Sequence, residues 1–286
     1  MLSHEYLDKR KVSQSFDRAA PTYEQWASLQ KMVGEDLLER LQWVKLAPRQ
    51  ILEVGAGVGR LSRALSKQYK QAQVYAIDIA PEMVKQGRKQ APRWFSKQHF
   101  VCADAAHLPF ADDSVDLLVS NLMLQWCNDI RAIFAEFARV LKPEGALFFS
   151  SFGPDTLKEL RESWASVDNA SHVNRFLDMH NYGDALLQAG LSNPVMDVDR
   201  LECTYSDVKQ LMKELKFLGA HNMTAGRSRG LTGKGKFKAM LAAYEQYRLA
   251  EGLLPATYEV VYGHAWGKQS ALPSVAIPIS QIGRPR

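Results

Sequence analysis

The sequence predicts an α/β fold built on a doubly wound, mostly parallel sheet of seven strands. One observation is a mostly apolar run, Ile51–Val54, that is interrupted by Glu53, ends at a cluster of glycines and leads into a helical pattern from Arg60. The other is the alternation of short strand patterns with helical patterns over residues 50–151, which is typical of parallel crossover connections. Ligands bind at the carboxyl ends of such strands, so the residues that follow each strand are the candidate site residues.

The expected elements follow in a regular order. Residues 4–47 are predicted to be helical with a break at Pro21, because proline fixes its own φ and disfavours helix in the residue before it. A turn is expected at Lys142-Pro143-Glu144-Gly145. Strands are expected near 50–54, 73–77, 99–102, 115–120, 146–151, 194–203 and 257–266, and helices near 59–68, 81–90, 129–141 and 180–189.

These elements divide the chain into five parts. We expect an N-terminal helical lid at 1–47, a ligand-binding core at 48–203, a basic helical insertion at 204–257, the last core strand at 258–267 and a loosely ordered tail at 268–286. Within residues 205–250, nine Lys and Arg residues face three acidic ones, a net charge of +6, whereas the whole chain carries +5. The positive charge is therefore concentrated in the insertion.

The composition is that of an ordinary globular protein, with 46% hydrophobic and 23% charged residues. No apolar run approaches the ~20 residues that cross a bilayer, and the N-terminus lacks the apolar core of a signal peptide. The cysteines, Cys102, Cys127 and Cys203, show neither a disulfide framework nor the spacing of a metal site. We therefore expect a cytoplasmic protein without a metal and without a membrane partner.

A glycine-rich loop flanked by carboxylates is the most informative pattern. Gly55, Gly57 and Gly59 alternate, Glu53 precedes them, and Asp78 ends the next strand. Glycine lets a ligand approach the backbone, and a carboxylate at the end of the second strand can accept hydrogen bonds from both hydroxyls of a ribose. The third glycine arrives one residue too early for a dinucleotide site. The pattern instead resembles motif I of the class I methyltransferases that depend on S-adenosylmethionine (SAM).

That resemblance implies further residues of a SAM site. Asp104, after the third strand, would accept from the adenine amino group while the N–H of Ala105 meets a ring nitrogen; the alternative is a turn or helix-capping aspartate. Met83 would pack on the adenine, or else fills the core, and Ile79 follows the ribose carboxylate. Asn121 begins the loop that flanks the methyl group.

No acid–base machinery stands out in the sequence. Methyl transfer to a carboxylate needs none, because a carboxylic acid of pKa ~4 is already ionised at pH 7. Positioning alone can contribute as much as ~7–11 kcal/mol. We therefore expect Tyr23, in a lid over residues 10–30, to position the reactants. Trp126 is either a wall of the substrate site or a buried aromatic residue.

Two longer motifs carry a more specific resemblance. Val12–Glu24 with Leu29-Gln30, and Leu215–Asn222 with Ala225–Gly233, resemble the malonyl-[acyl-carrier-protein] O-methyltransferases of biotin synthesis. The resemblance covers about residues 10–266, although the Lys- and Gly-rich stretch 233–238 and the long tail depart from it. It implies methylation of the free carboxylate of a malonyl thioester on an acyl carrier protein or coenzyme A. Methylation would remove a charge that an apolar pocket rejects.

The basic insertion suits an acidic carrier protein, whose approach a positive patch would steer. The candidate substrate and carrier contacts are His221, Arg227, Arg229, Lys234, Lys236 and Lys238. The alternative is that these lysines are a solvated helix face. Only Phe217 and Phe237 are interleaved with the basic residues, so no stacking platform for nucleic acid is predicted.

Two other functions are weighed against this one. A SAM-binding assembly factor or hydroxylase of respiratory complex I resembles the biotin enzymes closely, but it should carry an Arg- and Ser-rich targeting segment, and residues 1–12 include Glu5 and Asp8. A small-molecule methyltransferase acting on a quinone precursor or another acid would not need the basic insertion.

Overall fold

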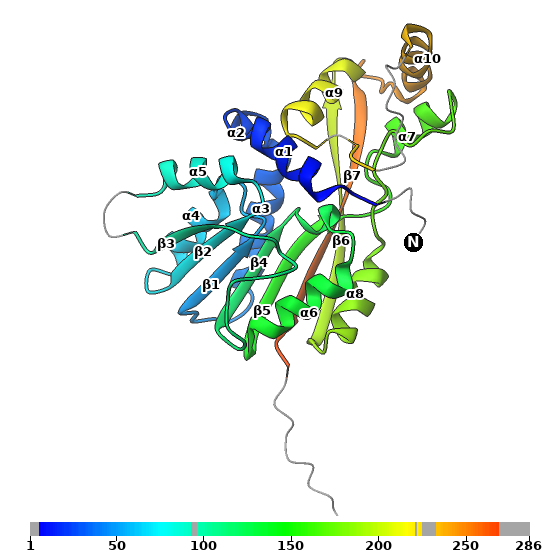
Figure 1. The fold of residues 1–286 in the computed structure, drawn as a ribbon. Coiled ribbons are helices and arrows are strands. Elements are labelled where there is room, and N and C mark those ends of the chain that lie inside the picture. The colour runs from blue at the N-terminus through cyan, green and yellow to red at the C-terminus, as the bar shows by residue number, and fades with distance from the viewer. Residues whose placement is uncertain (1–5, 93–95, 221, 225–232, 269–286) are drawn as a thin grey trace, which may run out of the picture.

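A seven-stranded sheet forms the centre of the computed structural model, which describes residues 6–92, 96–220, 222–224 and 233–268 (Figure 1). The strand order is β3-β2-β1-β4-β5-β7-β6. The strands are β1 (Gln50–Val54), β2 (Gln73–Asp78), β3 (Gln98–Cys102), β4 (Val115–Asn121), β5 (Leu141–Phe152), β6 (Ser192–Tyr205) and β7 (Leu254–Trp266). Strands β1 to β5 pair in parallel, whereas β7 is antiparallel to both β5 and β6. The predicted fold class is confirmed.

Alternating side chains of the strands divide the core into two layers. Ile51 packs in the cluster that includes α3 (Ser28–Gln42) and α4 (Arg60–Gln68), whereas its neighbour Leu52 packs in the cluster that includes α6 (Ile130–Val140) and α8 (Met179–Gln188). Successive strand residues point to opposite faces, so a continuous apolar run is required where both faces are covered. Helix α5 (Pro81–Gln90) packs on β3 beside α4.

The expected turn at residues 142–145 is wrong, because these residues lie within β5. Leu141 pairs with Val115 and Ala146 pairs with Leu117, so β5 pairs with β4 both before and after a shift in register. The ammonium of Lys142 lies 2.6 Å from a carboxylate oxygen of Asp116, the residue of β4 between the two pairs. The segment is therefore a bulge in a long strand.

Two short N-terminal helices lie across the carboxyl ends of the strands. Helix α1 (Lys9–Ala19) begins at the N-cap Asp8 and ends directly before the expected break, and α2 (Tyr23–Trp26) follows it. The hydroxyl of Ser13 donates to the carbonyl of Ile79, and the N–H of Glu82 donates to the carboxylate of Asp17, so α1 is tied to the segment after β2.

Along the chain, β6 is followed by two described helices of the insertion, α9 (Val208–Phe217) and α10 (Lys234–Tyr244). The 3-10 helix η2 (Glu245–Tyr247) follows them, ahead of β7. Strand β7 starts at Leu254, ahead of the expected boundary at 258. Helix α7 (Lys158–Ala165) and the 3-10 turn η1 (Leu124–Trp126) were not expected. Within the described residues, no helix combines the length and the hydropathy that crossing a bilayer requires. The tail from residue 269 lies outside the described residues.

Candidate cofactor site

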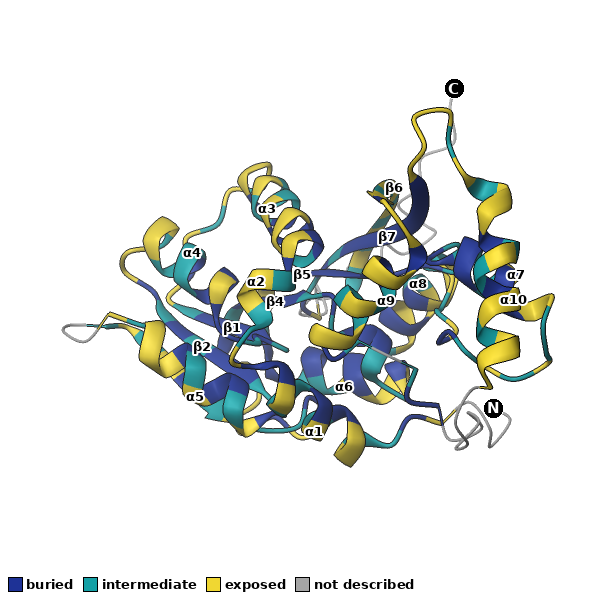
Figure 2. Cartoon of the chain, turned by 90° about the horizontal axis from the view of Figure 1, so that it is seen from above, coloured by how far each residue is buried: buried dark blue, intermediate teal, exposed yellow. Residues whose placement is uncertain are grey.

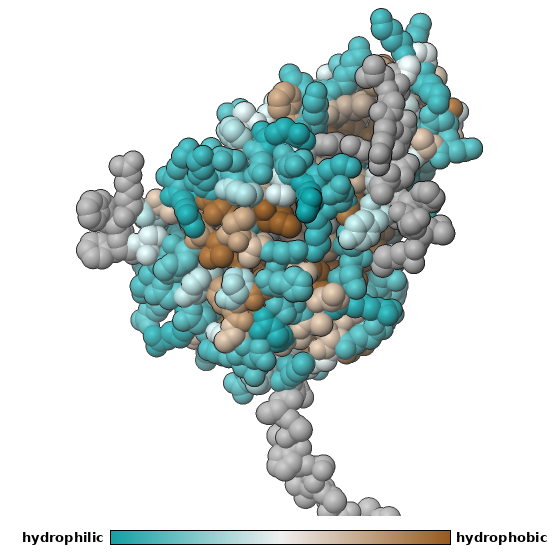
Figure 3. All heavy atoms as spheres, in the orientation of Figure 1, coloured by the Kyte–Doolittle hydropathy of each residue, from teal (hydrophilic) through white to brown (hydrophobic). Residues whose placement is uncertain are grey.

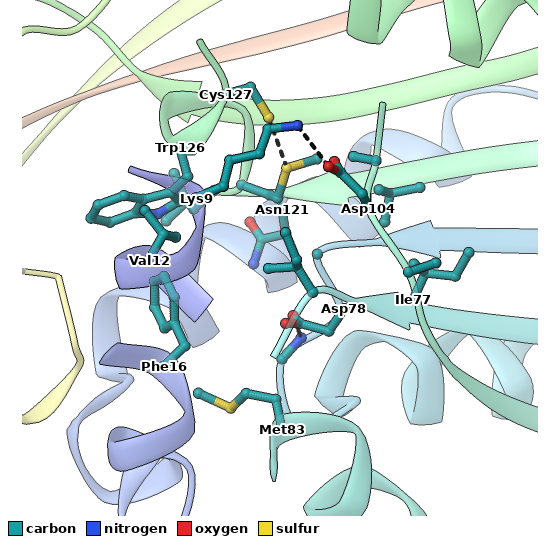
Figure 4. Close-up of a pocket in the computed structure, with 18 of the residues that line it drawn as sticks. Lys9, Val12, Phe16, Ile77, Asp78, Met83, Asp104, Asn121, Trp126 and Cys127 are labelled. Carbon is teal, nitrogen blue, oxygen red and sulfur yellow. Dashed lines mark hydrogen bonds and ion pairs between the residues drawn. The ribbon is translucent and has the colours of Figure 1, made fainter. Parts of the chain in front are cut away.

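A cavity at the carboxyl ends of β1 to β4 gathers most of the predicted site (Figure 4). It encloses about 760 Å³ of space, part of it open to solvent. Figure 3 shows hydrophobic residues gathered beneath α1, with hydrophilic residues around them. The predicted residues that line the cavity are Tyr23, Gly55, Gly57, Asp78, Ile79, Met83, Asp104, Ala105, Asn121 and Trp126.

The glycine loop after β1 forms one wall of this cavity. Gly55 and Gly57 have positive φ angles, of 76° and 53°, which residues other than glycine rarely adopt. A Cβ at Gly55 would lie 2.2 Å from the side chain of Met123, whereas at Gly57 the nearest atom would be Cε1 of Tyr23 at 3.7 Å. Gly55 is therefore required by packing, and Gly57 leaves an open backbone surface for a ligand.

The carboxylate of Asp78 is held at the end of β2 by backbone donors. The N–H of Gly57 donates to Oδ2 and the N–H of Ala80 donates to Oδ1, each at 2.8 Å. Burial nevertheless raises the pKa of Asp78 to about 6. Each carboxylate oxygen keeps a second lone pair, so the group can still accept from a ligand in the cavity.

Glu53 and Gly59 do not line the main cavity. Glu53 is 2% exposed and accepts from the hydroxyl of Ser62 on α4. Burial, with a contribution from the charge of Asp78, raises the pKa of Glu53 to about 7. Gly59 is the N-cap of α4, where a Cβ would lie 2.5 Å from the ring of Phe100. Gly59 therefore allows close packing, and it does not line the cavity.

Glu53 borders a second cleft of about 1560 Å³ between the lid helices and α4. The cleft and the cavity share Tyr23, Gly55, Gly57 and Asn121. Tyr23 thus lies where the two spaces adjoin, and burial together with the charges of Asp78 and Glu53 raises the pKa of its phenol. A neutral phenol at this junction can donate a hydrogen bond into either space.

Lys9 is a residue of the cavity that the sequence reasoning missed. Its ammonium lies 2.6 Å from Oδ2 of Asp104, and the N–H of Ala106 donates to Oδ1 of the same carboxylate (Figure 4). Partial burial acts to raise the pKa of Asp104, but the hydrogen bonds from Ala106 and Lys9 hold it below its usual value. The signal was present, since Lys9 recurs at helical spacing with Val12 and Phe16.

An apolar wall faces the carboxylates of Asp78 and Asp104. The rings of Phe16 and Trp126 meet edge to face, with centroids 5.3 Å apart, and Val12 and Met83 are buried beside the cavity. Trp126 is therefore part of the wall and not a residue of the deep core. Cys127, which also lines the cavity, has its thiol 3.5 Å from the sulfur of Met123 (Figure 4).

The amide of Asn121 is engaged within the protein. Its Nδ2 donates to the carbonyl of Gln30 on α3, and its Oδ1 accepts from the hydroxyl of Ser150 on β5. Asn121 therefore ties the end of β4 to the lid while it borders both spaces.

Of the predicted substrate contacts, the three that the structure describes do not line the cavity. His221, Arg227 and Arg229 lie outside the described residues. Lys234, Lys236 and Lys238 begin α10, which packs against α7, and none of them lines the cavity. The ammonium of Lys236 lies 2.9 Å from a carboxylate oxygen of Asp168. In the part of the chain that the structure describes, no group of three or more His, Cys, Asp or Glu side chains is arranged to hold a metal ion.

Comparisons with known proteins show the family to which this chain belongs. A family model described as a methyltransferase domain matches residues 52–149. A malonyl-[acyl-carrier protein] O-methyltransferase of Methylovorus sp. (strain MP688) is 50% identical over 280 residues, which are 96% of this chain and 94% of the relative. The enzyme of that name in Gallionella capsiferriformans is 49% identical over 91% of both chains. The chain belongs to this family of methyltransferases.

Solved structures show the same fold at low identity. The YcgJ protein of Bacillus subtilis has a TM-score of 0.60 and 17% identity, over 82% of this chain and 99% of that one. Phosphoethanolamine N-methyltransferase 2 of Haemonchus contortus, in complex with SAM, has a TM-score of 0.54 and 15% identity, over 82% of this chain and 52% of that one. The chain is a methyltransferase of this family with the fold of these solved structures.

Proposed function

We propose that this protein transfers the methyl group of SAM to the free carboxylate of a malonyl thioester carried by an acyl carrier protein. The observation that carries the proposal is the identity of 50% over 96% of the chain to a relative of that name. An alignment that covers 96% of the chain includes most of the lid and the insertion as well as the methyltransferase domain at residues 52–149.

The described residues fit SAM, which supplies the activated methyl group when it is bound. Asp78 would accept from the ribose hydroxyls through its remaining lone pairs, and Gly57 would leave the backbone surface that a ligand needs. Asp104, Ala105, Ile79 and Met83 would hold the adenine. Glu53, Gly55 and Asn121 border the space beside the glycine loop, where the remainder of the cofactor would lie.

The remaining residues of the cavity would position the acceptor and exclude water. The malonyl carboxylate is ionised at neutral pH, so no side chain has to remove a proton from it. Tyr23 lies at the junction of the two spaces, and Trp126 with Phe16 forms an apolar wall opposite the carboxylates. Such a wall removes water from the reacting groups and fixes their direction of approach.

We propose the basic insertion as the part that receives the carrier protein, with His221, Arg227 and Arg229 as candidate contacts of the malonyl group or its phosphopantetheine arm. Arginine forks grip a carboxylate or a phosphate through two parallel hydrogen bonds, which suits either role. The three cysteines are free, which supports the proposed location in a reducing cytoplasm.

A methyl-transfer assay with malonyl-carrier protein, malonyl-coenzyme A and a quinone precursor, each with SAM, tests the proposal. We expect a methyl ester of the malonyl-carrier protein, detected by mass spectrometry of the intact carrier. Malonyl-coenzyme A carries the same acceptor without the protein, so its relative kcat/KM measures the contribution of the carrier. Methylation of the quinone precursor alone would refute the proposed function.

A further inference from the structure

The insertion presents two lysine-bearing helices, and the structure distinguishes them. Helix α9 carries Lys209, Lys213 and Lys216 at spacings of four and three residues, so the three side chains share one helix face. All three are exposed, and none of them forms an ion pair with a carboxylate among the described residues. We call these three residues the α9 lysine face.

The lysines of α10 differ in their partners. Lys236 is neutralised by Asp168, whose carboxylate also contacts His172 at 2.8 Å. Helix α10 is fixed to the protein by Met240 and Tyr244, both fully buried. Lys234 and Lys238, by contrast, form no ion pair with any carboxylate in the described part of the chain.

The position of α9 relative to the lid also sets it apart. The ring of Phe217, at the end of α9, stacks on Trp26 of α2, with centroids 4.8 Å apart and planes inclined by 8°. The ammonium of Lys213 lies 5.7 Å and 5.9 Å from the centroids of these two rings. Helix α2 also carries Tyr23, so the stack joins the α9 lysine face to the helix that borders the cavity.

A second contact follows directly after α9. The hydroxyl of Ser15 on α1 donates to the carbonyl of Gly219 at 3.1 Å. Figures 1 and 2 show α9 beside α2, while α10 lies at one end of the molecule beside α7. A partner bound to α9 would therefore contact the rim of the site, and one bound to α10 would not.

The acidic residue of α9, Glu214, lies off the α9 lysine face, because consecutive residues of a helix do not share a face. Glu214 is half-buried beside Tyr205 of β6, and burial raises the pKa of its carboxyl despite the hydrogen bond from that tyrosine. Phe217 is 39% exposed, which adds an apolar centre to the lysine face. An aromatic group surrounded by charges of one sign is suited to a partner of the opposite sign.

We propose that the acidic carrier protein docks on the α9 lysine face, against the exposed edge of the Trp26–Phe217 stack, and that the α10 lysines lie outside the contact. This inference rests on the proposed function and specifies its partner surface. Docking there brings the carrier to the lid, so that its malonyl arm enters beside Tyr23.

Paired charge reversals on the two helices provide the test. Lys209→Glu with Lys216→Glu removes the outer charges of the α9 lysine face and leaves Lys213 on its aromatic rings. The comparison variant, Lys234→Glu with Lys238→Glu on α10, changes the net charge by the same amount. We expect the α9 pair to raise the KM for malonyl-carrier protein about tenfold and the α10 pair to raise it less than about threefold.

A short malonyl thioester without phosphates separates docking from chemistry. We expect its kcat/KM to be the same in both variants and the wild type, and the salt dependence of the carrier KM to be weaker in the α9 variant. Should the α9 pair fail to fold in thermal melts, Lys209→Gln with Lys216→Gln replaces it, and direct titration of labelled carrier protein measures affinity without turnover.

An α10 effect as large as the α9 effect, or an unchanged KM in the α9 variant, would overturn the docking site. An equal loss with the short thioester would also overturn it, since the lysines would then act on the reaction and not on the carrier. If wild-type protein methylates neither malonyl substrate, the proposed function itself fails, which is a different result.

Discussion

Replacing Glu53 by glutamine should make the cofactor-free protein more stable at alkaline pH. Glu53 is 2% exposed, and its pKa is raised by burial to about 7 from an ordinary value of 4.5. A carboxyl whose pKa is raised by folding contributes stability that is fully present below pH 4.5 and is lost as the pH rises through about 7. At about 1.4 kcal/mol per pH unit, ionising this group costs the folded state roughly 3 kcal/mol at pH 8.

Glutamine has nearly the same shape, stays neutral and can still accept from Ser62. Urea unfolding at pH 5, 6, 7 and 8 without cofactor, followed by tryptophan fluorescence and circular dichroism, measures the difference. We expect the stability gained by Glu53→Gln to grow through this range towards roughly 3 kcal/mol. Glu144→Gln, at an exposed position, is the control and should show no such trend. A gain that does not vary with pH would refute the reasoning.

The same substitution separates stability from binding. The ionised carboxylate lies beside the cleft proposed for part of the cofactor, and SAM carries a positive sulfonium. Glu53→Gln should therefore bind SAM more weakly at pH 8 although the free protein is more stable, a combination that titration calorimetry can detect.

Three further substitutions probe the cavity. Asp78→Asn should weaken SAM binding by about 1.5–3 kcal/mol, the range for hydrogen bonds to a charged group, and unchanged affinity in calorimetry would contradict the ribose assignment. Tyr23→Phe should lower kcat while the melting temperature stays nearly constant, and a fully active variant would exclude the phenol from positioning the reactants. Lys9→Met should tighten binding of S-adenosylhomocysteine, because it frees Asp104 from its ion pair with Lys9. The two side chains are 38% and 32% exposed, so the ion pair is worth only ~0.2–1 kcal/mol and the gain should be small. Weaker binding in that variant would show that Lys9 supports the cofactor instead of competing with its adenine.

The sequence alone determined the fold class and most of the residues that line the cavity at the carboxyl ends of β1 to β4. The periodicity of apolar residues in strands and helices is a local property of the sequence. The alternating glycines likewise indicate a particular loop conformation, whatever the position of that loop in the fold. Because parallel strands end at one edge of a sheet, placing Asp78 and Asp104 at strand ends was sufficient to predict that both carboxylates line one cavity.

Contacts between distant parts of the chain were decided only by the tertiary structure. No local pattern indicates that β7 inserts between β5 and β6, or that Lys9 reaches Asp104, which lies 95 residues away. The burial of Glu53 against Ser62, the ion pair of Lys236 with Asp168 and the stacking of Trp26 on Phe217 are of the same kind. Such contacts depend on how the packed helices and strands meet in space. The charge and chemical type of a side chain allow many possible partners, and only the close packing of the fold selects which of them it contacts.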